Sequence, residues 1–478
     1  MSGFLKTVNT LPKTFWAANT LELFERWAYY GLFNLLAIYL TNSTATGALG
    51  FTQVEKGMIM GIVNAILYFL PIITGSLADK FGYKKVLIVA FVILSSGYYI
   101  MGIVTTFAAV FLAFLYVAVG AALFKPIISA TIAKTTNESN ASIGFGIFYM
   151  IINIGGLIGP FTASYLREIS WNYMFLMSSG AILLNLLIVI FFFKEPLRVD
   201  NSESLAKSLG TVFRNIFTVL KDFKFVSFLL IIVGAWTVYW QYFYSLPVFI
   251  EQWVDTAPMY NALYSVWPGF AKAIGTSDGL ILTEKIIAMD AFFIVAFQVI
   301  ISYVVIKLKP LSSMTIGIII NSLGLVLMVL TRNPFFVLTS IIIFSIGEMV
   351  FSPKILEYIG GIAPKDKAAL YMGTQFLPIA LGNFFGGFIS GGVYLNLSDK
   401  FEMIKKMFPE LSSLNLTNEQ LTEKALLMLN TDNKGLTNLL WNTYHPYMFG
   451  AVLLGLGIAT VILLFLYDRK YKKELKFK

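Results

Sequence analysis

The chain has 478 residues, of which 57% are hydrophobic and only 13% are charged. Because soluble globular proteins carry about 25% charged residues, this composition excludes an ordinary soluble domain. The sequence contains no cysteine and one histidine, which excludes disulfides, thiolate metal sites, cysteine nucleophiles and multi-histidine metal centres. The formal net charge of +9 fits basic loops beside a membrane. No nucleic-acid-binding motif accompanies it, so we expect no nucleic acid partner.

The first apolar segment, residues 15–40, carries charged side chains in its first half, and two phenolic side chains follow them. An ionisable side chain at the bilayer centre costs about 2.5–3.5 kcal/mol, so such residues need a protein interior, a water-filled cavity or one another. At about 100° per residue, the polar side chains share a helix arc of roughly 140°. They are Glu22, Glu25, Arg26, Tyr29 and Tyr30. The face is either a static ion cluster or a stripe that handles protons and substrate, and intramembrane charge favours the second interpretation.

Apolar runs of about twenty residues recur along the chain and predict an all-α integral membrane protein with twelve transmembrane helices. The expected spans are residues 15–40, 57–78, 84–105, 107–133, 142–166, 171–193, 226–250, 285–307, 312–331, 334–359, 368–395 and 444–467. The lipid bilayer is therefore the first expected partner of the chain.

Basic residues cluster after spans two, eight and ten and in the C-terminal tail, always on the same expected side. This positive-inside pattern predicts that both termini are cytoplasmic, and no cleavable signal peptide is evident. The segments 252–283 and 397–443 are expected to lie outside. The basic residues are Lys80, Lys84, Lys85, Lys307, Lys309, Lys365, Lys367, Arg469, Lys470, Lys472, Lys473, Lys476 and Lys478.

The spans fall into two sets of six. Residues 1–193 and 226–478 form the expected halves, and residues 194–225 form a polar, basic linker between them. An amphipathic helix around 204–221 is expected to lie at the membrane surface. Six plus six spans with a basic central linker is the plan of a major facilitator transporter, whose halves rock about a site at the membrane midplane.

Gly75, Asp79 and Gly82 lie in the loop after span two, within the string GSLADKFGYKK. The string resembles the major facilitator loop pattern G-x-x-x-D-[RK]-x-G-x-[RK]-[RK]. In this interpretation Asp79 accepts hydrogen bonds from a neighbouring helix end, Gly82 turns the chain, and the lysines anchor the loop inside. The pattern indicates fold and gating rather than a substrate.

Two further strings narrow the family. ELFERWAYYG, which begins at Glu22, resembles the E-x-x-E-R-[FW]-x-Y-Y-G signature of proton-dependent oligopeptide transporters. FYMIINIGGL, which begins at Phe148, resembles their second signature, F-Y-x-x-I-N-x-G-S-L, with Gly156 in place of serine. LFKP around Lys125 and the G-E and S-P pairs around Glu348 resemble the family's motifs in spans four and ten. The resemblance thus covers both expected halves.

This resemblance implies a proton-coupled symporter of the cell (inner) membrane that imports di- or tripeptides, or peptide-like compounds, by alternating access. Lys125 lies too deep for easy snorkelling and needs a carboxylate, which is that of Glu22, of Glu25 or of the substrate. A substrate that takes Lys125 frees a protein carboxylate to bind or release a proton. Glu348 is expected to hold a substrate ammonium. Lys125 and Glu348 are expected to face one hydrated chamber.

The candidate residues form two sets. The expected proton-coupling residues are Glu22, Glu25, Arg26, Lys125 and Asp290. The expected substrate-binding residues are Tyr29, Tyr30, Tyr68, Lys125, Asn153, Trp240, Asp290, Glu348 and Gln375. We expect no catalytic residue, no metal, no cofactor besides the coupling proton, and a monomeric protein. The chain has no P-loop pattern.

Besides Gly156, four positions depart from the family pattern. Phe33 stands where members usually carry a second arginine, and Trp240 stands where they carry a glutamate before Gln241. That arginine and glutamate are expected to face each other, and the loss of both avoids an orphaned charge. Gln375 replaces a pocket tryptophan. Asp290 replaces an asparagine and is expected to supply part of the lost proton chemistry.

The departures keep other functions open. A proton-linked carrier or exporter of a non-peptide solute is favoured by the substitutions at positions 33, 240 and 375. A non-transporting membrane receptor is disfavoured, because a sensor needs no buried proton relay. An enzyme is least favoured, because the intramembrane carboxylates neighbour cations rather than a nucleophile.

Overall fold

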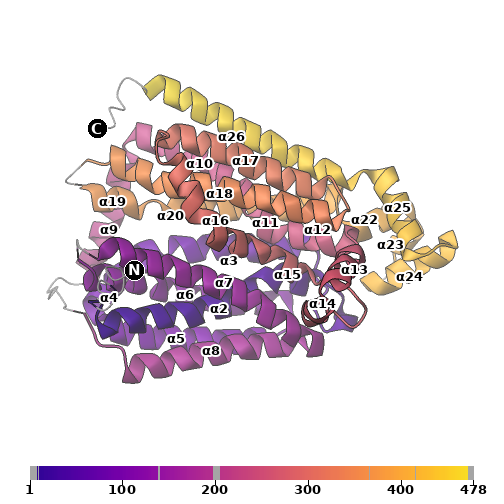
Figure 1. Cartoon of the computed structure of the whole chain (residues 1–478), viewed down its shortest axis with the longest axis horizontal. Helices are drawn as coiled ribbons and strands as arrows, with labels where there is room; N and C mark the ends of the chain where they lie inside the picture. Colours follow the sequence, from indigo (N-terminus) through magenta and orange to yellow (C-terminus); the bar gives the residue numbers. More distant parts are fainter. Residues whose placement is uncertain are drawn as a thin grey trace. The chain divides into compact units, whose positions relative to one another are not determined.

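The computed structural model describes residues 8, 10–137, 140–196, 205–364, 367–414 and 416–471. These residues form helices, turns and loops (Figure 1). The β pairing among them is an isolated bridge between Gly275 and Ile281. Helices suit lipid because every backbone N–H and C=O is paired inside the segment. Residues 197–204 of the expected linker, Lys365 and the basic tail from residue 472 onward lie outside the described residues.

The first six spans lie close to their expected positions. They are α2 (Lys13–Thr41), α3 (Gln53–Phe69) with α4 (Pro71–Phe81), α5 (Tyr83–Met101), α6 (Phe107–Thr135), α7 (Ala141–Ile169) and α8 (Trp171–Phe191). The second span bends by 44° between α3 and α4. The bend falls at Pro71, which has no N–H with which to continue the hydrogen bonds of α3.

The last six spans also match, although three of them are divided into shorter helices. They are α10 (Phe223–Tyr239) with α11 (Gln241–Tyr244) and α12 (Leu246–Trp253), α15 (Thr283–Ile287) with α16 (Met289–Val305), α17 (Pro310–Val329), α18 (Pro334–Ile362), α19 (Ala368–Gly373) with α20 (Phe376–Phe388) and α21 (Tyr394–Leu397), and α26 (Phe449–Tyr471). A π-helical turn, Ile389–Val393, joins α20 to α21.

Among the described residues, ten helices are long and apolar enough to cross a membrane, and the bent pair α3–α4 makes an eleventh span. Helix α2 is the twelfth span that the sequence predicts. Its 29 residues reach about 43 Å at 1.5 Å per residue, which exceeds a hydrocarbon core of about 30 Å. Its charged side chains lower its hydropathy. The prediction of an all-α membrane fold is confirmed, and ten or eleven of the twelve predicted spans are found by length and composition among the described residues.

Short helices occupy the connections. Helix α9 (Leu205–Leu220) lies in the linker, where the sequence predicts a helix around 204–221. The connections predicted to lie outside hold α13 (Ala257–Val266), α14 (Pro268–Ile274), α22 (Lys400–Met407), α23 (Pro409–Ser412), α24 (Asn418–Leu429) and α25 (Asn433–Tyr444).

The chain divides into two compact units. The first contact unit comprises Met1–Leu32, Val63–Leu229 and Ile362–Ala380, and the second comprises Phe33–Ile62, Leu230–Gly361 and Leu381–Lys478. In the first unit α5 packs against α6 and α8, and in the second α17 packs along α26 (Figure 1). These units follow packing rather than the linker, so the expected halves, 1–193 and 226–478, stay a prediction.

Within the second contact unit, α3 and α20 cross with their backbones in contact. A Cβ at Gly57 would overlap the carbonyl oxygen of Gly387, and a Cβ at Gly61 would lie 2.7 Å from the Cα of Gly387. Small residues allow such close approach of membrane helices. The start of span two is therefore held directly against span eleven.

Gly57→Ala is expected to destabilise the protein, because the added methyl group must push α3 away from α20. Overpacking of this kind costs about 1–3 kcal/mol. The measurement is the free energy of unfolding in detergent. Gly455→Ala on α26 is the matched control, since a Cβ there meets no atom within 4 Å. Equal stability of the two variants contradicts the close crossing.

Candidate functional site

The charged face of α2 is a buried ion cluster in the first contact unit. The exposed fractions of Glu22, Glu25 and Arg26 are 6%, 0% and 6%. Arg26 pairs with both carboxylates: its Nε lies 3.2 Å from Glu22 Oε1, and its guanidinium also contacts Glu25. The i,i+4 spacing of Glu22 and Arg26 places them one turn apart on the same face. One cation thus balances two acids inside a membrane-spanning helix.

Two phenols surround the guanidinium. The Cζ of Arg26 lies 5.0 Å from the ring centre of Tyr29 and 5.7 Å from that of Tyr30, both within cation–π range. The two rings meet edge to face at 5.3 Å. The predicted polar arc of α2 is therefore a connected set of charged and aromatic side chains.

Lys125 on α6 lies against tyrosine rings instead of a carboxylate. Its Nζ is 4.1 Å from the ring centre of Tyr68 and 5.8 Å from that of Tyr29. The direct ion pair with Glu22 or Glu25 that the sequence led us to expect is not formed among the described residues, because Arg26 takes both carboxylates. The side chain of Lys125 is only half-buried. Its ammonium therefore keeps hydrogen-bonding capacity for a ligand carboxylate.

Two further candidates belong to the first contact unit. Asn153 on α7 is half-buried, and its amide donates to the carbonyl of Tyr149 at 2.8 Å, within its own helix. Gln375 lies between α19 and α20, is half-buried, and donates its backbone N–H to Met372. No substrate contact is defined by either geometry, so their binding roles stay predictions.

The second contact unit brings Asp290 and Glu348 into one network. Ser345, one turn before Glu348 on α18, donates to Asp290 at 2.5 Å. Tyr239 donates to Glu348 Oε1 at 3.1 Å. The other oxygen, Oε2, is buried and has no hydrogen-bond partner among the described residues. The two carboxylates act electrostatically on each other. Glu348 therefore offers an acceptor for a ligand cation.

Trp240 stands at the break between α10 and α11, and it contacts Phe33. Their rings meet edge to face at 6.0 Å, and both side chains are buried. Phe33 also lies 5.5 Å from the ring of Phe243. The sequence-based expectation that positions 33 and 240 face each other is thus confirmed. An aromatic contact occupies the place where the family is expected to carry an arginine and a glutamate.

In the loop motif Gly82 makes the expected turn, but among the described residues Asp79 does not accept hydrogen bonds from the backbone of a neighbouring helix end. Gly82 adopts a φ of 92°, which favours glycine. Asp79 is exposed and accepts from the hydroxyl of Tyr83 at 3.2 Å. The start of α5 is instead capped by Glu195, which accepts from the backbone N–H of Tyr83 at 2.6 Å and of Lys84 at 3.3 Å. An acid just after span six, within a basic region, was the available signal for this role.

Gly75 faces α6, where a Cβ would meet Pro126 at 3.9 Å. Nearby, a pocket of about 690 Å³ in the first contact unit is lined by residues of α4, α9 and α19. Asp79 and Lys367 both line it. The loop motif therefore borders the linker helix as well as α5.

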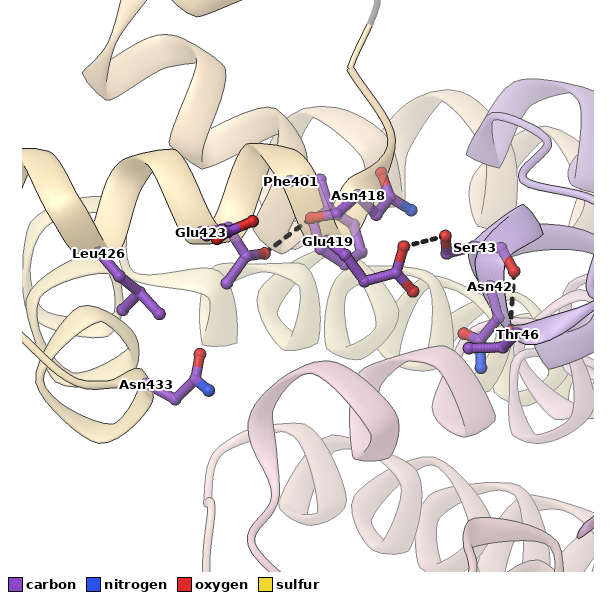
Figure 2. A pocket seen from close by; sticks show the side chains of 10 residues that line it. Asn42, Ser43, Thr46, Phe401, Asn418, Glu419, Glu423, Leu426 and Asn433 are labelled. Carbon is purple, nitrogen blue, oxygen red and sulfur yellow. Dashed lines mark hydrogen bonds between the residues drawn. The ribbon is translucent and has the colours of Figure 1, made fainter.

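A pocket of about 400 Å³ lies in the second contact unit (Figure 2). Glu419 and Glu423 of α24 line it together with Ser43, which follows α2. The hydroxyl of Ser43 donates to Glu419. Among the residues that the structure describes, no group of three acidic or histidine side chains could hold a metal ion.

Comparisons with known proteins relate the chain to membrane transporters. The family model of the Major Facilitator Superfamily matches residues 23–253. The uncharacterized transporter YclF of Bacillus subtilis is 25% identical over 430 residues, which cover 77% of this chain and 86% of the relative. Dipeptide and tripeptide permease B of Salmonella typhimurium is 23% identical, and the match covers 87% of this chain and 95% of the permease. The peptide transporter YePEPT of Yersinia enterocolitica is 22% identical, with 82% and 89% covered.

Solved structures show the same fold. A POT family transporter in complex with a thioalcohol-conjugated peptide has a TM-score of 0.72 at 16% identity, covering 98% of this chain and 100% of that chain. A POT family transporter in complex with 5-aminolevulinic acid has a TM-score of 0.68 at 17% identity, with the same coverage. Over most of its length the chain is therefore similar to peptide transporters, its fold is that of POT family transporters, and the Major Facilitator Superfamily model matches its first half.

Proposed function

We propose that this protein is a proton-coupled symporter that imports di- or tripeptides, or peptide-like compounds, by alternating access. The proposal rests on two buried or half-buried charged side chains, Lys125 and Glu348, that can still bind a ligand. Lys125 has no ion pair with a carboxylate, and Glu348 Oε2 has no hydrogen-bond partner, among the described residues. A zwitterion offers a carboxylate and an ammonium that match them.

In this mechanism Lys125 binds the substrate carboxylate and Glu348 binds the substrate ammonium. Charge-assisted hydrogen bonds are the strong ones in a water-poor site. Tyr29, Tyr30, Tyr68 and Asn153 border the carboxylate end, and Trp240, Asp290 and Gln375 complete the binding set. These roles extend the sequence-based assignment to the substrate.

Proton coupling is assigned to Glu22, Glu25 and Arg26 with Lys125, and to Asp290. A substrate carboxylate at Lys125 offsets the positive charge of its ammonium, which frees one of the protein carboxylates to bind or release a proton. The membrane potential supplies about 2.3 kcal/mol per charge per 100 mV, so a neutral zwitterion is accumulated without ATP.

Proteoliposomes test this function directly. With an acidic exterior and a negative interior, labelled dialanine is expected to accumulate at least about tenfold. One proton per 100 mV supports about 50-fold accumulation, and the pH gradient adds to this driving force. A protonophore is expected to abolish the accumulation. Absence of dialanine accumulation in folded, reconstituted protein contradicts peptide symport.

A second candidate is a proton-linked carrier or exporter of a non-peptide solute. The uncharged contact between Phe33 and Trp240 favours it, because the substrate passes rings where the family is expected to present charges. A competition panel separates the candidates: dipeptides inhibit uptake only in the first case, and small organic anions only in the second.

The proposal extends to location and assembly. The chain is a multi-pass protein of a membrane transporter family, which is not an enzyme class. We assign it to the cell (inner) membrane with both termini in the cytoplasm, as a monomer that uses protons and no cofactor. The basic residues after spans two, eight and ten support this orientation.

A further inference from the structure

Positions 33 and 240 lie toward the end of the bundle that the positive-inside pattern predicts to face outside. The contact between them is made by uncharged rings. Rings of Phe33, Trp240 and Tyr244 pack together there. An alternating-access carrier needs a contact that holds this end shut and then releases it. The second contact unit contains such a contact at other residues.

Lys56, in the first turn of α3, is fully buried, with an exposed fraction of 0%. Its Nζ donates to the backbone carbonyl of Tyr244 in span seven at 2.8 Å. The ammonium also lies 5.1 Å from the ring centre of Tyr394 in span eleven. A buried ammonium is costly unless its partners stay in place, so Lys56 favours the arrangement that joins spans two, seven and eleven.

Asp399 is the acid of this region, and its exposed fraction is 4%. Its Oδ2 accepts from Gln53 of α3 at 2.8 Å and from Gln252 of α12 at 2.9 Å. Its Oδ1 accepts from the backbone N–H of Glu402 at 2.9 Å and so caps α22. The carboxylate also acts electrostatically on Lys56. One buried acid therefore ties α3 to α12 and to the end of span eleven.

We propose that Lys56 and Asp399 form a latch that holds the outer end of the transporter closed, in place of an ion pair between positions 33 and 240. The inference rests on the proposed function, because only an alternating-access carrier must open this end. Opening separates α3 from α12 and α21, which strips both charges of their partners. Lys56 and Asp399 are thus positioning residues that set the balance between closed and open states.

A separate link joins the end of α2 to α24. Figure 2 shows Ser43 donating to Glu419 of α24, at the edge of the pocket. Glu419 is exposed, and exposed charged contacts contribute little to stability. Ser43→Ala therefore serves as a control that removes a link between α2 and α24 without touching the latch.

The absence of cysteine makes a single-cysteine reporter straightforward. Met60 on α3 is fully buried, and its carbonyl accepts from the hydroxyl of Tyr244 at 2.9 Å. Met60→Cys is placed in the wild-type background and in Asp399→Asn, and the rate of maleimide labelling is measured in lipid nanodiscs without substrate. Asp399→Asn is expected to raise that rate by about tenfold or more, because hydrogen bonds to a charged group are lost.

The matched control is Asp432→Asn. Asp432 caps α25 through the N–H of Gly435 at 2.7 Å, as Asp399 caps α22. Asparagine caps helices about as well as aspartate, so both variants retain a cap and only one loses the latch charge. Asp432→Asn and Ser43→Ala are expected to label at the wild-type rate. Faster labelling in either of them, equal to that of Asp399→Asn, overturns the latch.

A second variant tests the latch independently if Asp399→Asn does not fold. Gln53→Leu removes the bond from α3 and leaves the cap of α22 intact, and it is expected to speed labelling in the same direction. If both Gln53→Leu and Asp399→Asn fold and label at the wild-type rate, the proposal is overturned. If only Gln53→Leu folds, the comparison of its labelling rate with the wild-type rate decides. The readout needs no substrate, so absent dialanine uptake by the wild type overturns the proposed function and leaves the latch result standing.

Discussion

Lys125→Ala is expected to reduce proton-driven dialanine uptake to the background of empty liposomes. The ammonium is the only group of α6 assigned to the substrate carboxylate, and alanine leaves that carboxylate without its partner. Truncation of one partner of a buried charge pair costs about 2–5 kcal/mol, which corresponds to at least a 30-fold loss. Initial uptake rates and dialanine affinity by thermal shift both report the change.

The matched control lies on the same helix. Lys134 is exposed near the end of α6, and its Nζ lies 4.4 Å from the ring centre of Tyr83, much as Lys125 lies over Tyr68. Lys134→Ala removes the same groups from a similar tyrosine contact, and it is expected to retain uptake. Normal driven uptake by Lys125→Ala removes the proposed substrate role of Lys125.

Arg26→Gln is expected to lower the free energy of unfolding by about 3–5 kcal/mol. Glu22 and Glu25 then stay buried beside each other without the guanidinium that pairs with both. Such a loss is a large part of the stability of most folded proteins, which is about 5–15 kcal/mol. Chemical unfolding in detergent, followed by circular dichroism, measures it.

Two variants sharpen this expectation. Arg214→Gln makes the same change on the exposed face of α9 and is expected to leave stability unchanged within about 0.5 kcal/mol. The triple variant Glu22→Gln, Glu25→Gln and Arg26→Gln removes the whole cluster, so it is expected to recover most of the loss. A mild effect of Arg26→Gln alone would falsify the view that the cation balances both acids.

Hydropathy and helical periodicity predicted the spans and the polar arc of α2, because both are local properties of the sequence. The arc places Glu22, Arg26 and Tyr29 on one face, and the structure confirms their contacts. The contact between Phe33 and Trp240 was also predictable, since two charged positions that are expected to pair were lost together.

The partners of single charged residues were harder to predict. The sequence predicted a carboxylate partner for Lys125. In the structure Arg26 pairs with Glu22 and Glu25, and the ammonium of Lys125 lies over a tyrosine ring. The competition between two cations for the same acids depends on side-chain geometry, which periodicity does not contain. The cap on α5 went to Glu195 for the same reason.

The Lys56 and Asp399 pair was missed altogether. Each residue lies at the edge of an apolar run, where a charge normally marks the membrane surface. Their burial follows from the crossing of α3 and α20 at Gly57 and Gly387, residues separated by most of the chain. A pattern read within one span does not report a contact between spans.

The ring contact between Phe33 and Trp240 has a consequence for the surroundings in which the carrier works. Exposed charge pairs weaken as ionic strength rises, with a Debye length of about 8 Å in physiological salt, whereas aromatic packing has nothing to screen. This ring contact therefore keeps its strength from dilute to saline media, whereas an ion pair open to water at the same positions would weaken.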